Sequence, residues 1–322
     1  MDALNSLISW CCIMAAGGDN NFTRYIYRGE EGEIIPLEAT HIVVGEDCTF
    51  VRARAFMWHH NIVEVICHNN VEKIEKYAFD NCHRLSRVIM PGVKVVEGGV
   101  FNNCKALSGV KCGKLERIEE MAFSYCESLE SMNLPSARIV EGSAFYECTA
   151  LTDAKFSNKL ESIHPGAFAY CSSLEQMTIP LKDGIIAYDD IFRECHSFRH
   201  IDLVEEAELH ETIAALQLEE WRNDMNKEMD SINQILPNAP ASSYGVYGNV
   251  RPGEKAHVIW TWIGSVLRKI IHYKAEHQRV LNEAATTLQF ALPQDIVTKS
   301  VLPFLDLRSY TFEGDDQEDE SD

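Results

Sequence analysis

Cysteine and histidine are the residues of this chain whose abundance points to chemistry, because both bind metal ions and a cysteine thiolate is a nucleophile. The sequence contains 11 cysteines and 12 histidines. Six of the cysteines recur at intervals of 22 to 24 residues: Cys82, Cys104, Cys126, Cys148, Cys171 and Cys195. A period of this kind indicates a position in a repeated structural unit and not a single reactive centre.

The densest group of possible metal ligands lies near the start of that period. His59 and His60 are close in sequence to Cys48, Cys67 and His68. This group contains neither a C-x2-C pair nor an H-x3–5-H pair, which are the spacings typical of structural zinc. His59 also stands at the position that cysteine fills in later units. We therefore expect no metal site and no cofactor.

Catalytic motifs give no support for an enzyme. The sequence has no G-x-S-x-G elbow, no phosphate-binding Walker loop and no dinucleotide fingerprint. A nucleophilic cysteine needs partial exposure and a lowered pKa. The periodic cysteines are expected to be buried, so we predict that the chain is not an enzyme.

The period itself predicts the fold. A two-residue motif that ends in phenylalanine returns seven times, at Phe56, Phe79, Phe101, Phe123, Phe145, Phe168 and Phe192. Around it each unit reads V/L-x-x-I/V-x-x-x-A-F-x-x-C-x-x-L-x-x-V-x-L/I-P. A single unit cannot bury its apolar side, so neighbouring units must stack. We predict an α+β repeat solenoid of about seven coils of 22–24 residues.

Two spacings alternate within each unit. The V-x-L pairs are two residues apart, as on one face of a strand, and Pro91, Pro135 and Pro180 end these strands because proline cannot donate to a ladder. The A-F-x-x-C-x-x-L stretch has three- and four-residue spacing, which predicts one helical or 3₁₀ turn per coil.

This pattern resembles the BspA-type subfamily of leucine-rich repeats over residues 51–204. The resemblance implies a leucine-rich repeat solenoid that presents a binding surface, and it implies no particular ligand. Residues 205–312 resemble the C-terminal part of a group of eukaryotic proteins with these repeats.

The outward residues of the strands are the candidate binding site, because alternate residues of a strand face opposite sides. We predict a non-enzymatic scaffold that binds a partner protein on this strand face. An alternative is that a polar outer face only keeps the solenoid soluble. The candidate contact residues are Glu64, Arg87, Ile89, Lys111, Asn133, Asp153, Lys155, Gln176, Thr178, His200 and Asp202.

The flanking segments define the remaining organisation. We assign residues 1–42 to an N-terminal segment and cap, 43–204 to the solenoid, 205–236 to a first helix, 237–253 to a linker, 254–312 to a second helix followed by a short one, and 313–322 to an acidic disordered tail. We expect the helices to form a hairpin that covers the last coil. The alternative is that the apolar stripe along these helices forms a coiled-coil dimer. We therefore expect either a monomer or a helix-mediated dimer.

Charge and hydropathy limit the partners and the compartment. A formal net charge of −20 and a pI near 5.0 argue against binding to nucleic acid or to an anionic membrane surface. No apolar run is long enough to insert into a bilayer. Residues 4–16 are apolar, but only Asp2 precedes them with a charge, whereas a signal peptide normally starts with positive residues. We expect a cytoplasmic protein with reduced thiols, a secreted one being less favoured.

Two other functions remain open at this point. Residues 292–305 include L-P-Q-D-I and V-L-P-F-L, which is similar to the opening helix of an F-box and implies a ubiquitin-ligase substrate adaptor. Only 30 residues follow Leu292, so the later F-box helices are missing. A secreted or surface adhesin is the other alternative.

Overall fold

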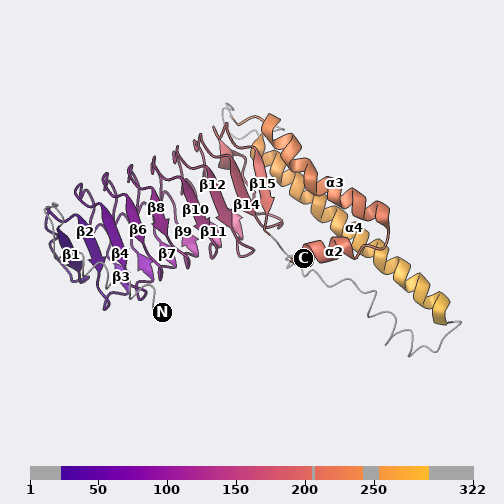
Figure 1. The fold of residues 1–322 in the computed structure, drawn as a ribbon, viewed down its shortest axis with the longest axis horizontal. Coiled ribbons are helices and arrows are strands. Elements are labelled where there is room, and N and C mark those ends of the chain that lie inside the picture. Colours follow the sequence, from indigo (N-terminus) through magenta and orange to yellow (C-terminus); the bar gives the residue numbers. More distant parts are fainter. Residues whose placement is uncertain (1–22, 205–206, 242–253, 290–322) are drawn as a thin grey trace, which may run out of the picture.

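The computed structural model describes residues 23–204, 207–241 and 254–289. Figure 1 shows a row of parallel strands that forms an elongated solenoid, followed by helices packed at its C-terminal end. The chain is therefore a solenoid of about seven turns with a helical C-terminal region, as the period predicts.

The V-x-L segments form the longer strands of the solenoid, and within each of two sheets every strand pairs in parallel with its counterpart in the next coil. The first five are β1 (Arg24–Tyr27), β2 (His41–Val44), β4 (Glu64–Cys67), β6 (Arg87–Ile89) and β8 (Gly109–Lys111). A second sheet continues with β10 (Ser131–Leu134), β12 (Asp153–Phe156), β14 (Gln176–Ile179) and β15 (His200–Leu203). Each of the three repeat prolines lies one or two residues beyond a strand end, as expected.

A second ladder of strands, two residues each, forms another side of the solenoid. It comes from the V/L-x-x-I/V part of each unit: β3 (Phe50–Val51), β5 (Lys73–Ile74), β7 (Val95–Val96), β9 (Arg117–Ile118), β11 (Ile139–Val140) and β13 (Ser162–Ile163). Three-residue spacing between apolar positions does not reveal strands this short.

The predicted helical turn around each phenylalanine is wrong for most coils. Only the last coil forms a 3₁₀ helix, η2 (Asp189–Phe192). In the others, alternate backbone amides bond to different partners. The amide of Phe79 donates to the carbonyl of Val100 in the next coil at 2.9 Å, and the next amide, that of Asp80, donates within its own coil to Tyr77 at 3.2 Å. A helix would use every amide within the coil and leave the neighbouring coil unpaired.

Left-handed residues make this alternation possible. The residues two before and two after each of the first six repeat phenylalanines have positive φ angles, for example Tyr77 at 59° and Asn81 at 60°. Most of these positions hold residues other than glycine. A residue with a Cβ atom is sterically strained at a positive φ angle. The inter-coil hydrogen bonds offset this strain, and the side chains at these positions, apart from that of Asn81, are exposed or half-buried.

The core is a column of equivalent side chains. Consecutive phenylalanine rings stack with centroids 4.8–5.5 Å apart from Phe56 to Phe168. All seven repeat phenylalanines and all six periodic cysteines are buried. The proposed stacking of identical positions in successive coils is therefore confirmed.

The parallel ladder begins earlier than residue 43. Strands β1 and β2 pair in register, with Tyr25 opposite Ile42 and Tyr27 opposite Val44. Tyr27 packs edge-on against Phe56 at 5.0 Å between ring centroids, so it extends the aromatic column toward the N-terminus. The two strands lack the A-F-x-x-C signature between them, so the repeat pattern alone does not reveal them.

The C-terminal helices form a hairpin against the last coil (Figure 1). They are α2 (Ala207–Ala214), α3 (Glu219–Ile235), the short η3 (Leu236–Asn238) and α4 (Lys255–Gln289). The first predicted helix is thus divided by a break at residues 215–218. The apolar residues Ile259, Ile263, Val266 and Ile270 of α4 are buried in the same cluster as the solenoid core. Dimerisation through this part of the stripe would require the hairpin to open.

The hairpin is tied to the solenoid by polar contacts as well. Lys255, at the start of α4, is buried and donates hydrogen bonds to the carbonyls of Phe198 and Leu236. Burial lowers the pKa of its ammonium group. Within the hairpin, Lys269 of α4 lies 2.8 Å from a carboxylate oxygen of Asp224 and 3.0 Å from one of Glu228.

Candidate functional site

The outward face of the longer strands is the candidate site, and the structure brings its residues into two straight rows. In the first sheet one row runs through His41, Glu64 and Arg87, which are register partners. Ile89 and Lys111 are partners in the second row of this sheet, and the rows of the second sheet contain the remaining candidates. Apart from Ile89, all of the predicted contact residues are exposed or half-buried, and they lie on one face.

The charges on this face are largely paired with each other. Arg87 lies 3.3 Å from Glu64 in the neighbouring strand and Lys155 lies 3.5 Å from Asp153, while the His200 ring forms a hydrogen bond with Asp202 at 2.9 Å. Exposed pairs of this kind contribute about 0–1 kcal/mol each to stability. They leave a nearly balanced surface in the C-terminal half of the face.

Ile89 is the one predicted contact residue that is buried. It occupies an outward register position between Ile66 and Lys111, but its side chain is only 8% exposed. Two further outward residues, Ile26 and Val43, continue the same row toward the N-terminus. The repeat pattern did not identify them because they precede the first A-F-x-x-C unit.

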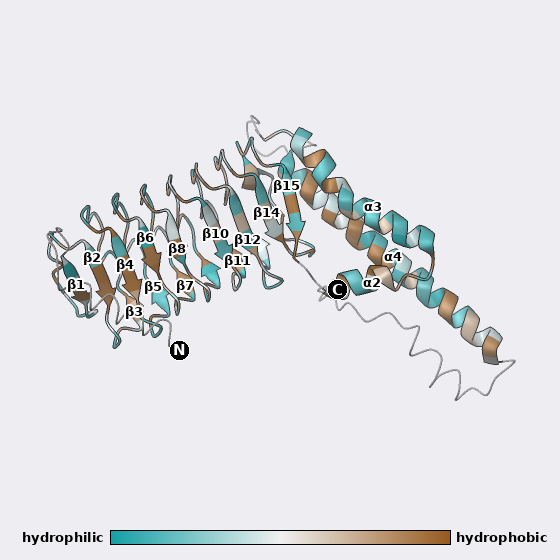
Figure 2. Cartoon of the chain, viewed as in Figure 1, coloured by the Kyte–Doolittle hydropathy of each residue, from teal (hydrophilic) through white to brown (hydrophobic). Residues whose placement is uncertain are grey.

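The second outward row of the first sheet is therefore apolar. Ile26, Val43, Ile66 and Ile89 stand side by side on four successive strands, and Ile26 at the edge is 56% exposed. In Figure 2 the ribbons of β2, β4 and β6 are mostly hydrophobic, whereas β10 and β12 mix hydrophilic and hydrophobic residues. One of the two outward rows is thus apolar in the N-terminal half of the strand face, whereas both rows are polar in the C-terminal half.

The periodic thiols are structural hydrogen-bond donors. Each donates from Sγ to the carbonyl of the phenylalanine one coil earlier, over distances of 3.0–3.3 Å. Burial raises the pKa of Cys82 to about 12 and the pKa values of Cys104 and Cys126 well above their ordinary value. A thiol with a raised pKa and no exposure is a poor nucleophile.

His59 replaces cysteine in the first coil and is buried there. Burial lowers the pKa of its imidazole, and its Nε2 has no hydrogen-bond partner among the described residues. In all of the described residues, no three histidine, cysteine or acidic side chains lie close enough together to hold a metal ion.

Comparison with known families decides the identity of the repeat. The family described as "BspA type Leucine rich repeat region (6 copies)" matches residues 38–141 and 94–214, which together make up more than half of the chain. The chain belongs to this BspA-type leucine-rich repeat family. Leucine-rich repeat proteins are generally protein-interaction scaffolds and are typically not enzymes.

The solved bacterial proteins that resemble this chain are only distantly similar to it. A leucine-rich repeat protein from Bacteroides ovatus is 20% identical, with 53% of this chain and 47% of that chain covered and a TM-score of 0.44. The T. pallidum leucine-rich repeat protein TpLRR is 21% identical over 57% and 70% of the two chains, with a TM-score of 0.36. The pneumococcal vaccine antigen PcpA is 18% identical over 56% and 54%, with a TM-score of 0.39.

The chain thus spans about half the length of the Bacteroides and pneumococcal proteins that it matches. A comparison with curated proteins finds no match. In the described residues no helix has both the length and the apolar character needed to cross a membrane.

A hollow of about 490 Å³ lies on the turn side of the BspA-type coils. It arises where Ser143 and Gly166 take the outward left-handed positions that Tyr77 and Met121 fill in other coils. Its charged and aromatic lining consists of Glu120, Glu141, Tyr146, His164, Asp190 and Arg193. This mixture of charges selects no single class of ligand.

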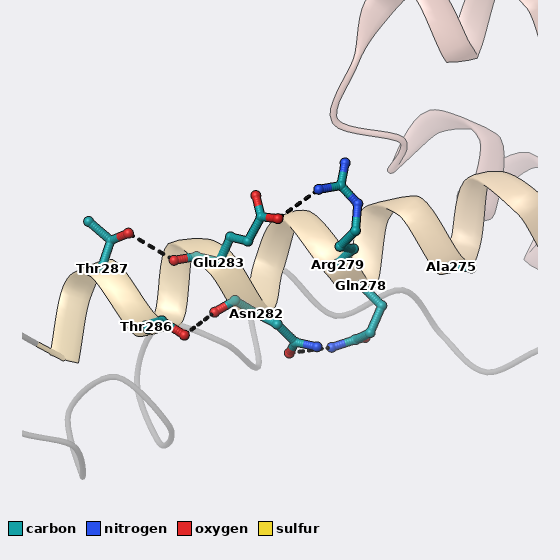
Figure 3. A pocket seen from close by; sticks show the side chains of 7 residues that line it. All are labelled: Ala275, Gln278, Arg279, Asn282, Glu283, Thr286 and Thr287. Atoms are coloured by element: carbon teal, nitrogen blue, oxygen red, sulfur yellow. Dashed lines mark hydrogen bonds and ion pairs between the residues drawn. The ribbon is translucent and has the colours of Figure 1, made fainter.

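A larger hollow of about 750 Å³ lies along the distal end of α4, and among the described residues its lining comes from that helix. Figure 3 shows that its polar side chains bond along the helix, for example Arg279 to Glu283 at 2.6 Å and Thr287 to the carbonyl of Glu283 at 2.9 Å. Because these groups satisfy each other, they form no ligand site. The F-box-like residues 292–305, the apolar residues 4–16 and the acidic tail lie outside the described residues.

Proposed function

We propose that this chain is a non-enzymatic scaffold that binds a partner protein on the strand face of the solenoid. The observation that carries the proposal is the in-register apolar row of Ile26, Val43, Ile66 and Ile89 on an outward sheet surface. A solenoid does not need apolar residues there to fold, because its core lies on the other side of the strands.

The arrangement around this row fits a protein partner. Protein interfaces have an apolar centre surrounded by a polar rim. Here the apolar row is bordered by His41, Glu64 and Arg87 on the same strands and by Lys111 at its end. The paired charges of the C-terminal half would then contribute specificity more than affinity.

We also propose that the protein works in a reducing compartment such as the cytoplasm. The six periodic cysteines support this, because each acts as a hydrogen-bond donor and only the reduced thiol carries the proton. Disulfides are rare in such compartments.

Affinity purification of the intact chain, with its partner identified and its affinity then measured for the purified pair, tests the proposal. The test variants are Ile66→Asp, which places a charge in the apolar row, and the triple variant Arg87→Glu, Lys111→Glu, Lys155→Glu. We expect each to weaken binding of the partner at least tenfold, which corresponds to about 1.4 kcal/mol.

The matched control reverses three exposed lysines away from this face, Lys76→Glu, Lys114→Glu and Lys159→Glu. It changes the net charge by the same amount as the triple test variant. If both triple variants lost the same affinity for the partner, the loss would be due to the change in net charge and not to the strand face. Full binding by Ile66→Asp would place the interface elsewhere and contradict the proposal.

A further inference from the structure

Two histidines that are 23 residues apart in sequence lie face to face on the turn side of the solenoid. His60 and His83 each occupy the position four residues after a repeat phenylalanine. Their ring centroids are 5.2 Å apart and the ring planes differ by 9°. The stacking of coils therefore brings two metal-binding side chains together at the surface.

Hydrogen bonding fixes which nitrogen of His83 is available. Its Nδ1 lies 3.1 Å from the backbone carbonyl of Asn103. A carbonyl only accepts hydrogen bonds, so Nδ1 carries the proton and Nε2 keeps its lone pair. A metal-binding histidine typically donates its other ring N–H in this way, which orients the ring and raises the basicity of the ligand nitrogen.

Trp58 packs against the pair, and the cation at the equivalent position of the next coil is paired with a carboxylate. Trp58 contacts both rings edge-on, at 6.0 Å from His60 and 6.4 Å from His83 between centroids. The equivalent position in the next coil is Lys105, whose ammonium group lies 2.7 Å from Glu127 and is neutralised by it. His60 is exposed, so its ring has room to turn toward that of His83.

We propose that His60 and His83 form a two-histidine site for a divalent transition-metal ion of the Cu²⁺ or Ni²⁺ type. Neutral imidazole is a preferred ligand of these ions, which bind more tightly than the earlier members of the series. Two nitrogens that share one metal must come within about 4.2 Å, given metal–nitrogen bonds of about 2.1 Å. A tilt of the exposed His60 ring brings the edges of the stacked rings together, and water completes the coordination.

The site is independent of the proposed partner surface, which lies on the longer strands. Metal-binding motifs with short spacings between ligands do not reveal this site, because its two histidines are one full coil apart in the sequence. Trp58 adds a built-in reporter, since a paramagnetic Cu²⁺ ion bound at His60 quenches the fluorescence of an adjacent indole.

Titration of the full-length protein with Cu²⁺ tests the site, followed by calorimetry and by electron paramagnetic resonance. We expect one tight site whose spectrum shows two nitrogen ligands. His60→Ala and His83→Ala should each weaken it about 100-fold, because the second ligand then no longer binds intramolecularly. The Trp58→Phe variant should lose most of the fluorescence quenching that Cu²⁺ causes in the wild type.

The matched control is His196→Ala. His196 fills the equivalent position in the last coil, is exposed, and bonds to Glu194 without a histidine beside it. Its replacement should leave the tight site intact. A two-nitrogen spectrum that persists in His60→Ala, or equal affinities in wild type and His60→Ala, would overturn the proposal. Because His60 is exposed, its variant is expected to fold, which a thermal melt verifies.

Discussion

The side-chain amide of Asn233 in α3 bonds to both backbone groups of Ile201 in β15. Its Oδ1 accepts the Ile201 N–H at 2.7 Å, and its Nδ2 donates to the Ile201 carbonyl at 3.0 Å. Strand β15 is the last of its sheet, so these groups have no further strand to pair with. The amide replaces one residue of that missing strand and closes the open edge of the solenoid.

Replacing Asn233 by alanine should expose this edge. We expect the free energy of unfolding to fall by about 1–3 kcal/mol, the cost of leaving partly buried backbone groups unpaired. Faster amide exchange at Ile201, measured by hydrogen–deuterium exchange, should accompany the loss. The control is Asn226→Ala on the exposed side of α3. Equal stability of the two variants would show that the hairpin does not close the edge through this contact.

Replacing Phe123 by alanine tests the stacked core. The ring is fully buried and stacks on Phe101 and Phe145 at 5.1 and 5.3 Å between centroids. Chemical denaturation should show a loss of about 3–5 kcal/mol, as for other buried aromatic residues. The exposed Lys111→Ala should stay within about 0.5 kcal/mol of wild type. A cost below about 1 kcal/mol for Phe123→Ala would contradict its place in the core.

Thiol labelling tests the cysteine column. The nine described cysteines are free and buried, and burial raises their pKa values. We expect a thiol reagent at pH 8 to react with the six periodic cysteines only after denaturation, when all six become available. Mass spectrometry of the labelled peptides identifies the sites. Rapid labelling of Cys126 or Cys148 in the native protein would be incompatible with the structure.

Alkaline pH should destabilise the fold. Burial raises the pKa of Cys82 from 9.0 to about 12, so the unfolded chain loses this proton first as the pH rises. The stability that the protonated thiol contributes is complete below pH 9 and declines between pH 9 and about 12. The slope is at most about 1.4 kcal/mol per pH unit for one thiol.

Cys82→Ala isolates this effect from other alkaline titrations. Lysine and tyrosine residues lose protons in the same range, but they do so in both proteins and largely cancel in the comparison. Unfolding midpoints between pH 8 and 10.5 should fall less steeply in the variant than in wild type. Parallel curves would show that Cys82 does not titrate differently in the two states.

Much of the architecture can be predicted from the sequence because each coil repeats the same local constraints. The 22–24-residue period placed Phe123 over Phe101 and Cys126 over Cys104, and the prolines marked the strand ends. The same regularity identified the outward residues of β10, β12 and β14. The apolar stripe of the helical segments favoured a hairpin that covers the last coil.

The tertiary structure decided what depends on contacts between coils. The turns around Phe79 do not form a helix, because alternate backbone amides there bond to carbonyls of the next coil and the residues two before and two after Phe79 have positive φ angles. A local sequence pattern does not indicate hydrogen bonds between coils. The apolar row reached Ile26 and Val43 only when β1 and β2 paired with the sheet. His60 and His83 became neighbours for the same reason. The sequence determines the period of the solenoid, but only stacking determines which surface residues meet, because those residues lie a full coil apart in the chain.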